Sequence, residues 1–463
     1  MKRYIEGKLI EWRLKPKRQP LILLGARQVG KTYTLKQFAK ENFKRYHYVN
    51  CEKERGSIAE VFAPDLDPQK IIDRLSLELN VPIENDELII LDEIQAVPNA
   101  LTALKYFYEE MPGLPIIAAG SLLGLRLNEE SFPVGKVDYL HMYPFTFFEF
   151  LEGIGDKLLL DNLFKELEYK NKPLSNLVHD KLWEKLKIYF VVGGLPVAIN
   201  TYKETKGSAF ERYTEVRNVQ EKLIDSYFDD ISKHSGKENA MQIERLWRNI
   251  PNQLAREQDG SSSRFRFKGI IPGIKSYSNL VGIIDWLGAA KLIIKVNIVD
   301  QARTPLSAFT KENCFKLFCF DVGLLGAMSG LQPKEILGYD YGEYKGYFAE
   351  NFVAQEMQAK NFKNNRLYSW SEARAELEFI INSDKYGIIP IEVKSGFNTQ
   401  AKSLKSYQDR YQPEFGLILS ALNFVFDARK KTYRYPLYLA SLVPELLPPP
   451  LGISSSSPQN SLL

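Results

Sequence analysis

Short apolar runs alternate with segments of helical period through the first third of the chain. Each run is apolar along most of its length, which is typical of strands in a parallel sheet covered by helices on both faces. The expected strands are 21–24, 46–50, 87–93, 114–121 and 139–143, and the expected helices between them are 33–40, 64–79 and 100–110. The pattern therefore predicts an α/β core over residues 1–150.

The pattern turns helical after residue 145 and stays helical to residue 235. Gly193-Gly194-Leu195-Pro196 interrupts it, because two glycines and a proline are strong helix breakers. An all-helical segment after a sheet of this kind predicts a lid over residues 151–235.

Residues 236–330 show the order of elements that a winged helix has. A helix at 240–257 precedes the flexible sequence DGSSS at 259–263, and a second helix at 276–287 leads into a strand at 292–296. A small helical packing module has the same order in sequence, so both interpretations stay open.

Residues 331–445 are predicted to form a second, smaller α/β domain. Its expected elements are a helix at 347–360, strands at 366–370, 376–381 and 388–394, a helix at 402–411 and a strand at 415–420. The sequence NSDKYG at 382–387 predicts a hairpin between two of these strands. Residues 446–463 contain three consecutive prolines and four consecutive serines, so we expect a disordered tail there.

The composition is that of a soluble globular protein. The chain has 463 residues, of which 44% are hydrophobic and 25% charged, and two to four domains are expected at this length. Its first residues lack the apolar core of a signal peptide, and no apolar run is long enough to cross a bilayer. The three cysteines form no C-x-x-C pair. We therefore expect a cytoplasmic protein that makes no use of a membrane.

Charge is distributed unevenly along the chain. The net charge of +4 gives no global electrostatic reason to expect nucleic acid. Residues 261–320, however, hold nine basic and three acidic residues, about +6 in total, so we expect any contact with DNA to involve this segment and the C-terminal domain. The basic residues are Arg264, Arg266, Lys268, Lys275, Lys291, Lys295, Arg303, Lys311 and Lys316.

Residues 25–32, GARQVGKT, fit the phosphate-binding pattern G-x-x-x-x-G-K-[ST]. The glycines allow successive backbone N–H groups to point at a phosphate, and the helix that follows adds the positive end of its dipole. Lys31 is expected to reach the β- and γ-phosphates, and the Thr32 hydroxyl to hold Mg²⁺. The expected binding residues for a nucleoside triphosphate are Gly25, Ala26, Arg27, Gln28, Val29, Gly30, Lys31, Thr32 and Tyr33.

Two carboxylates end the strand at 87–93. Asp92 is expected to orient Mg²⁺ and Glu93 to polarise the attacking water, because open α/β sheets bind ligands at the carboxyl ends of their strands. Ser121 ends the next strand and can bond the γ-phosphate or that water, or it is an ordinary turn serine. Arg126 and Lys136 follow on loops, as surface charges or as cations that complete the site.

Together these features resemble a family of bacterial and archaeal ATPases that join an AAA-type P-loop domain to a C-terminal domain of undefined function. The resemblance covers nearly the whole chain and implies ATP, rather than GTP, as the substrate. It rests on GARQVGKT at 25–32, LDEIQ at 91–95, AGS at 119–121, FPVGK at 132–136, YPF at 143–145, GGLP at 193–196, KLFCFDVGLL at 316–325 and IEVKSG at 391–396. The family usually has arginine at the position of Lys136, and lysine lacks the bidentate fork.

The C-terminal domain resembles a restriction-endonuclease-like core. Its pattern, an acid on one strand and (D/E)-x-K on the next with a helical glutamate before, matches Glu350, Glu378, Glu392 and Lys394 as a candidate second metal site. Two carboxylates would bind Mg²⁺, and the lysine would stabilise phosphate charge. Aspartate is usual where Glu378 stands, which puts nuclease geometry in question. The alternative is a retained fold whose acids and lysine pair without metal.

Three functions are compatible with these residues. The first is a Mg²⁺-dependent ATPase whose nucleotide state controls a C-terminal module that engages nucleic acid. The second is an ATP-dependent switch that acts on a protein partner without nucleic acid. An oligomer of the chain is also possible. The third is a metal-dependent nuclease with a regulatory ATPase domain. ATP hydrolysis is common to the first two and regulatory in the third.

Overall fold

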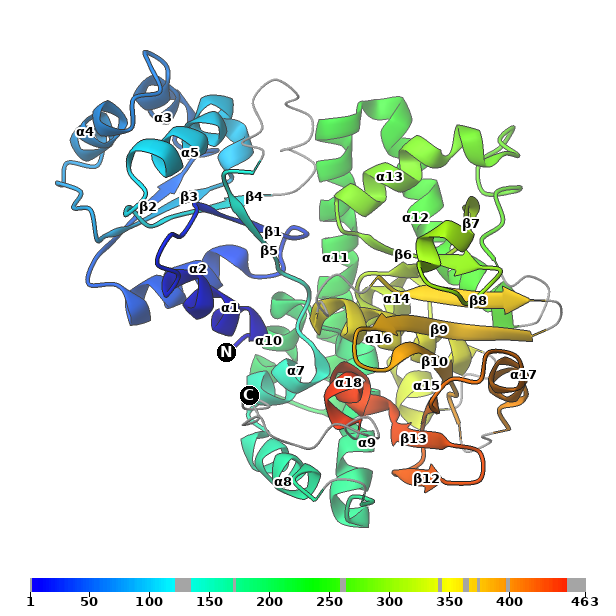
Figure 1. Ribbon diagram of the computed structural model, residues 1–463. Helices are drawn as coiled ribbons and strands as arrows, with labels where there is room; N and C mark the ends of the chain where they lie inside the picture. Colours follow the sequence, from blue (N-terminus) through cyan, green and yellow to red (C-terminus); the bar gives the residue numbers. More distant parts are fainter. Residues whose placement is uncertain are drawn as a thin grey trace. The chain divides into compact units, whose positions relative to one another are not determined.

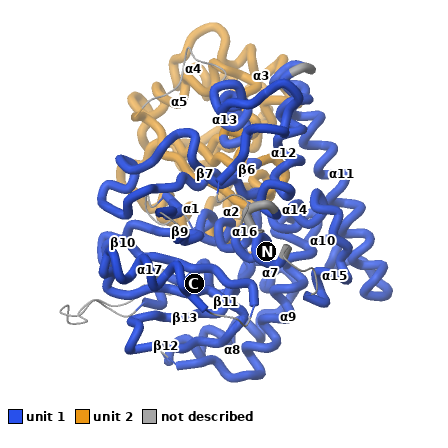
Figure 2. Tube along the Cα trace, turned by 90° about the vertical axis from the view of Figure 1, so that its right-hand side faces the viewer, with its two compact units in different colours: residues 1, 144–288, 292–463 blue, residues 2–143, 289–291 orange. Residues whose placement is uncertain are grey.

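The computed structural model describes residues 2–120, 135–169, 172–258, 264–339, 344–360, 366–372, 375–396 and 400–447. The chain divides into two compact units (Figure 2). The N-terminal unit comprises residues 2–143 with 289–291, and the C-terminal unit comprises 144–288 with 292–463. Among the described residues, no helix has both the length and the apolar character that a bilayer crossing requires.

The N-terminal unit contains a five-stranded parallel sheet in the order β2-β3-β4-β1-β5. This sheet confirms the predicted P-loop α/β core. Figure 1 shows α3, α4 and α5 on one face of the sheet and α1 and α2 on the other. The strands are β1 (Leu21–Leu24), β2 (Tyr46–Asn50), β3 (Leu88–Asp92), β4 (Ile116–Gly120) and β5 (Asp138–His141). The helices are α1 (Tyr4–Arg13), α2 (Lys31–Asn42), α3 (Arg55–Phe62), α4 (Pro68–Glu78), the 3₁₀ turn η1 (Ile94–Ala96) and α5 (Pro98–Glu110).

The C-terminal unit begins with helices, as predicted for the segment that starts near residue 145. They are α7 (Phe147–Ile154), α8 (Lys157–Leu167), α9 (Asn176–Val192), α10 (Pro196–Glu204), α11 (Ala209–Ser235) and α12 (Lys237–Gln258). The Gly193-Gly194 interruption separates α9 from α10, as expected. Tyr189 and Phe190 of α9 both pack against Phe352, and all three rings are buried.

A mixed eight-stranded sheet forms the rest of this unit, in the order β12-β13-β11-β10-β9-β8-β6-β7. Its strands are β6 (Ile293–Val299), β7 (Thr310–Cys319), β8 (Tyr368–Glu372), β9 (Ala375–Ser383), β10 (Gly387–Val393), β11 (Gly416–Ser420), β12 (Val425–Asp427) and β13 (Thr432–Pro436). The hairpin predicted at 382–387 is confirmed, because Gly387 pairs with Ser383 across it. The remaining helices are α13 (Val281–Ala289), α14 (Val322–Met328), α15 (Pro333–Gly338), α16 (Tyr344–Lys360), α17 (Lys402–Tyr411) and α18 (Val443–Leu446), with 3₁₀ turns η2 (Tyr277–Asn279), η3 (Leu306–Phe309) and η4 (Leu437–Leu442).

The domain boundaries expected at 235/236 and 330/331 stay predictions. Strand β6 pairs antiparallel with β7 and parallel with β8, so the strand predicted at 292–296 is part of the eight-stranded sheet. Residues 144–288 and 292–463 belong to one compact unit. The apolar sequence at 315–320 is buried along its whole length, which is typical of a strand that is covered on both faces.

The predicted order of helix, helix and strand does occur in α12, α13 and β6, and β7 pairs with β6 to form a hairpin. A winged-helix domain of its own stays a prediction, since its hairpin is shared with the larger sheet. The predicted tail at 446–463 lies, from residue 448 on, outside the described residues.

Candidate functional site

The loop at 25–30 joins the carboxyl end of β1 to the start of α2. Gln28 and Gly30 adopt positive φ angles of 62° and 98°, and Gly30 immediately precedes α2. A glycine at this position has no side chain with which to cap the helix, so the first N–H groups of α2 are left for a ligand. This backbone can receive an anion such as a phosphate.

Gly25 meets the end of β5 at close range. A Cβ atom on Gly25 would lie 2.4 Å from the carbonyl oxygen of Met142, while the Met142 N–H donates to Leu24 at 2.7 Å. Any larger residue at position 25 would push the loop away from the sheet. The first glycine of the motif is therefore required by packing as well as by backbone conformation.

The side chain of Lys31 is folded into this loop. Its Nζ donates to the carbonyl oxygens of Gly25 and Ala26, both at 2.9 Å, and the residue is 6% exposed. An ammonium held by two carbonyls can exchange them for phosphate oxygens, which carry more negative charge. The lysine thus lies where a bound triphosphate would meet it. Tyr33, which was expected to help bind the nucleotide, is 63% exposed on the next turn.

Thr32 and Asp92 meet across the sheet edge. The Thr32 hydroxyl donates to Asp92 Oδ2 at 2.6 Å, and the Tyr48 hydroxyl donates to the same oxygen at 2.9 Å. A hydroxyl and a buried carboxylate are oxygen ligands of the kind that Mg²⁺ prefers, so these two side chains fit the expected ion. Burial, together with the Asp92 carboxylate, raises the pKa of Tyr48 to about 12, so this phenol stays protonated and keeps donating.

Glu93 is held beside Asp92 by its neighbours. It has a left-handed backbone with φ 53°, its N–H donates to Asp92 Oδ1 at 3.1 Å, and Gln95 Nε2 donates to Glu93 Oε2 at 2.5 Å. A Cβ on Gly120, at the end of β4, would lie 2.4 Å from Gln95 Oε1. Gln95 therefore positions the candidate base against the neighbouring strand.

The other residues expected at this site have different outcomes. Ser121 and Arg126 lie outside the described residues. Lys136 forms an ion pair with Glu109, at 3.4 Å, and lies over the ring of Tyr108. Both of these contacts of the Lys136 ammonium are with side chains of α5.

Arg3 contacts the site although no sequence motif includes it. Its Nη1 donates to the carbonyl of Val29 at 3.1 Å, and its Nη2 donates to the carbonyl of Tyr143 at 2.7 Å. The residue is 7% exposed. Arg3 therefore ties the loop at 25–30 to Tyr143, which follows β5 in the N-terminal unit. Tyr48 was also missed, and the strand alternation at 46–50 was its only signal.

The four residues expected as a second metal site come together in the C-terminal unit, but as internal pairs. Lys394 Nζ lies 2.7 Å from Glu392 Oε1, and Glu392 Oε2 accepts the Leu404 N–H at 3.0 Å. Glu378 Oε2 accepts the Val393 N–H at 2.9 Å. Burial, with the nearby Glu350 carboxylate, raises the pKa of Glu378 above its ordinary value.

A fifth side chain, Lys316, enters this group from β7. Its Nζ lies 2.7 Å from Glu376 Oε1 and 3.6 Å from Glu350 Oε2. Within the described part of the chain, no group of three or more histidine, cysteine, aspartate or glutamate side chains is placed to hold a metal ion. The expected metal site of Glu350, Glu378, Glu392 and Lys394 stays a prediction. Charged oxygens that would have served a metal are paired with lysines and backbone N–H groups.

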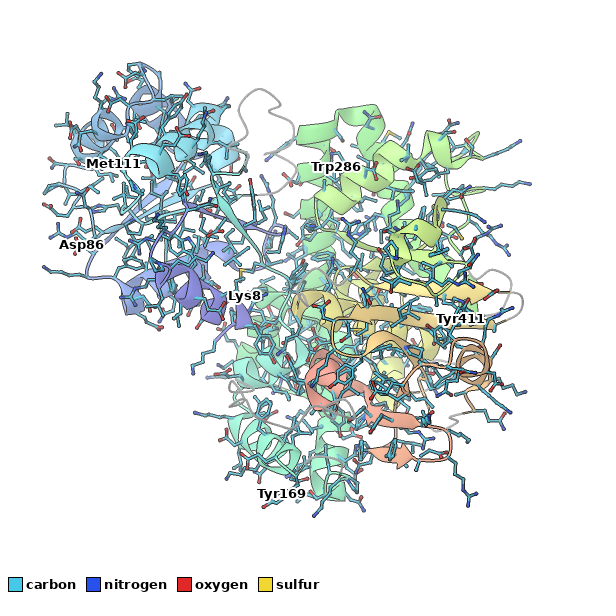
Figure 3. All side chains as sticks on the ribbon, viewed as in Figure 1. Lys8, Asp86, Met111, Tyr169, Trp286 and Tyr411 are labelled. Carbon is cyan, nitrogen blue, oxygen red and sulfur yellow. The ribbon has the colours of Figure 1, made fainter. Side chains whose placement is uncertain are left out.

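An aromatic group lies beyond this cluster, along α17. Trp370 packs against Tyr407 and Tyr411, and the Tyr411 hydroxyl donates to Glu372 at 2.8 Å. Figure 3 labels Tyr411 at this position in the C-terminal unit. These rings cover the α17 side of the sheet.

Three family matches cover most of the chain. Residues 17–151 match an AAA domain, residues 183–335 a domain of unknown function (DUF8612), and residues 345–439 another domain of unknown function (DUF4143). The predicted resemblance to AAA-type P-loop ATPases with a C-terminal domain of undefined function is thus confirmed. No curated protein matches the sequence.

Solved structures with some likeness to the chain are remote from it. The Aeropyrum pernix ORC1 protein in complex with DNA is 12% identical over 71% of this chain and 90% of that chain, with a TM-score of 0.27. Drosophila ORC bound to DNA is 14% identical over 73% and 95%, with a TM-score of 0.26. The Thermotoga maritima RuvB Holliday junction branch migration motor is 13% identical over 65% and 87%, with a TM-score of 0.29. Likeness at this level carries no inference about function.

Proposed function

We propose that this protein, whose residues 17–151 form an AAA domain, is a Mg²⁺-dependent ATPase whose nucleotide state controls a C-terminal unit that engages nucleic acid. The observation that carries the ATPase proposal is the meeting of Lys31, Thr32 and Asp92 at one edge of the parallel sheet. Lys31 and Thr32 begin α2, after the loop that follows β1, and Asp92 ends β3. Strand β4 pairs parallel with both β1 and β3, so the carboxyl ends of these strands lie at one edge of the sheet.

Each residue has a distinct task in hydrolysis. The loop N–H groups and Lys31 bind the β- and γ-phosphates, and Thr32 with Asp92 would hold Mg²⁺, which neutralises phosphate charge when bound. Glu93, oriented by Gln95, polarises a water and takes its proton as the water oxygen bonds to the γ-phosphorus. The bond between that phosphorus and the bridging oxygen breaks, and ADP and phosphate leave.

Exposed basic residues support the nucleic-acid part of the proposal. Arg264, Arg266 and Lys268 are exposed in the C-terminal unit, and nearby Lys295 lies over the ring of Phe315, 4.6 Å from its centroid. Cations beside aromatic rings suit a phosphate backbone and its bases. The likewise basic Lys316 does not contribute to this surface, because it is 3% exposed.

A protein partner or a second copy of the chain is the alternative occupant. Leu158, Leu177 and Phe210 are 77%, 66% and 79% exposed on the helices of the C-terminal unit. Exposed apolar side chains can contribute to a contact surface where they form one patch, while single ones are common on solvent-facing helices. DNA stimulation of ATP turnover, measured over a salt series, separates the two: stimulation that fades with salt supports nucleic acid, and turnover indifferent to DNA supports the protein switch.

The nucleotide site is tested by Lys31→Ala. Removing the ammonium loses charge-assisted bonds worth about 2–3 kcal/mol, so ATP affinity should fall roughly 30- to 150-fold. Isothermal titration with a non-hydrolysable ATP analogue measures this. Lys40→Ala, which removes an exposed lysine from the same helix, is the matched control and should bind as the wild type does. Unchanged affinity in Lys31→Ala would contradict the site.

Glu93→Gln separates binding from chemistry. The amide cannot accept the proton, so turnover should fall about 100- to 10,000-fold, while affinity for ATP stays within about threefold of the wild type. Single-turnover assays beside the titration give both quantities. A variant that hydrolyses ATP at the wild-type rate would remove Glu93 from its proposed role.

A further inference from the structure

Lys316 is a buried cation that the ATPase mechanism does not use. It lies in β7, where residues 315–319 are all buried, and is itself 3% exposed. Taking an ammonium out of water is costly unless opposite charge lies within reach. The ammonium of a lysine in such a strand therefore has to be paired with carboxylates from other elements.

Two carboxylates meet it from distant parts of the chain. Glu376 comes from β9, which β8 and β6 separate from β7 in the sheet, and its Oε1 lies 2.7 Å from the ammonium; Glu350 comes from α16, and its Oε2 lies at 3.6 Å. Glu350 is also buried, 5% exposed, so its carboxylate needs a cation as much as Lys316 needs an anion. The ammonium thus joins one strand and one helix at the centre of the acid group.

Two other acids of the group also have partners within the protein. Glu392 Oε1 pairs with the Lys394 ammonium, Glu392 Oε2 accepts the Leu404 N–H, and Glu378 Oε2 accepts the Val393 N–H. A divalent ion needs several carboxylate oxygens turned toward one point. Here the oxygens are turned toward two ammonium groups and two N–H groups instead.

We propose that Lys316 is the built-in cation of this acid cluster and holds Glu350 and Glu376 in place of a divalent metal. The cluster is consequently closed to Mg²⁺ and Mn²⁺, and the C-terminal unit does not cut phosphodiester bonds through Glu350, Glu378, Glu392 and Lys394. Replacing the lysine by a neutral residue should free its carboxylates and create a metal site. This proposal does not depend on the nucleotide site.

Mn²⁺ binding to the full chain tests the proposal, with free Mn²⁺ followed by electron paramagnetic resonance in the absence of nucleotide. The wild type should show no Mn²⁺ site tighter than about 1 mM that depends on Glu350. Lys316→Gln should gain one site at least tenfold tighter, and Lys316→Gln with Glu350→Gln should lose it. Lys311→Gln is the matched control, because Lys311 lies on the same strand and is exposed, 3.2 Å from Asp300. It should gain nothing.

Thermal melting gives a second reading. Mn²⁺ should raise the melting temperature of Lys316→Gln and leave that of the wild type and of Lys311→Gln unchanged. Two results would overturn the proposal. One is a Mn²⁺ site in the wild type that Glu350→Gln abolishes. This result can be obtained even if the Lys316 variants do not fold. The other is a folded Lys316→Gln that gains neither a site nor stability from Mn²⁺.

Discussion

Arg3 shows how a single side chain can join parts of the site that lie far apart in sequence. Its two bonded carbonyls belong to Val29, 26 residues away, and Tyr143, 140 residues away. Only a planar guanidinium presents two parallel N–H donors in this geometry. The loop at 25–30 and Tyr143 are therefore held by one group, and we expect a shift of the Val29 carbonyl to be felt at Tyr143 through Arg3.

Arg3→Lys tests this link. Lysine keeps the charge but cannot reach both carbonyls at once, so one bond is lost and ATP affinity should fall by about 1–1.5 kcal/mol, roughly 5- to 12-fold. Arg55→Lys, at the exposed start of α3, makes the same replacement away from the loop and should bind normally. Both are measured by titration well below their melting temperatures. Equal affinities in the two variants would show that Arg3 does not position the loop.

At the scale of elements, the turn between α9 and α10 fits against the start of α14. Gly194 N–H donates to Asp321 Oδ2 at 2.6 Å, and the same aspartate caps α14 through the Leu324 N–H at 3.0 Å. A Cβ on Gly193 would lie 2.3 Å from Asp321 Oδ1 and 2.9 Å from Gly323. The two glycines are therefore a packing requirement between helices, which explains why a helix breaker stands at this point of the sequence.

Gly193→Ala should be far more destabilising than Gly236→Ala. Both glycines have positive φ and near-extended ψ, 73° and −169° against 78° and 156°, so alanine suffers similar backbone strain of about 2 kcal/mol in each. Only Gly193 has atoms within 4 Å of the new Cβ, and that overlap adds about 2 kcal/mol more. Urea unfolding followed by tryptophan fluorescence measures both variants, since Trp183, Trp247, Trp286 and Trp370 report on this unit. Equal midpoints would refute the packing argument.

Elements defined by their own residues could be predicted from the sequence, and those defined by distant partners could not. The apolar run at 21–24 and the glycines around it specify strand, loop and helix locally, and the structure has β1 and α2 there. The hairpin at 382–387 is equally local. The pairing of β6 with β8, by contrast, joins residues some 70 positions apart, such as Asn297 and Tyr368. It also depends on which of several apolar strands pair with one another.

The residues of the two candidate sites also differ in whether a local sequence pattern predicts them. Lys31, Thr32 and Asp92 follow from spacing, because a motif and a strand end put them at one sheet edge. The roles of Arg3 and Lys316 could not be predicted in this way, because each depends on bonding partners that are distant in the sequence. A lysine inside the apolar sequence FKLFCF at 315–320 was the one available sign that Lys316 is buried and paired.

At the scale of the whole molecule, positive and negative charges nearly balance, and this makes local tests decisive. The net charge is +4, so replacing any three lysines or arginines by glutamine lowers it to +1. Long-range attraction to DNA changes by the same amount wherever the three lie. A difference between two such triple variants therefore reports on contact at one surface and not on overall charge.

The triple variant Arg264→Gln, Arg266→Gln, Lys268→Gln should leave a DNA column at lower salt than the wild type, provided that this exposed segment meets the phosphate backbone. Each lost phosphate contact lowers the slope of log affinity against log salt by about 0.9, so the slope should fall by about 2–3. The control triple Lys157→Gln, Lys165→Gln, Lys181→Gln removes the same charge from exposed positions on α8 and α9 and should behave nearly as the wild type does. If both triples shift equally, attraction is only global. If the wild type is not retained even at low salt, the protein-partner switch becomes the better account of what the ATPase controls.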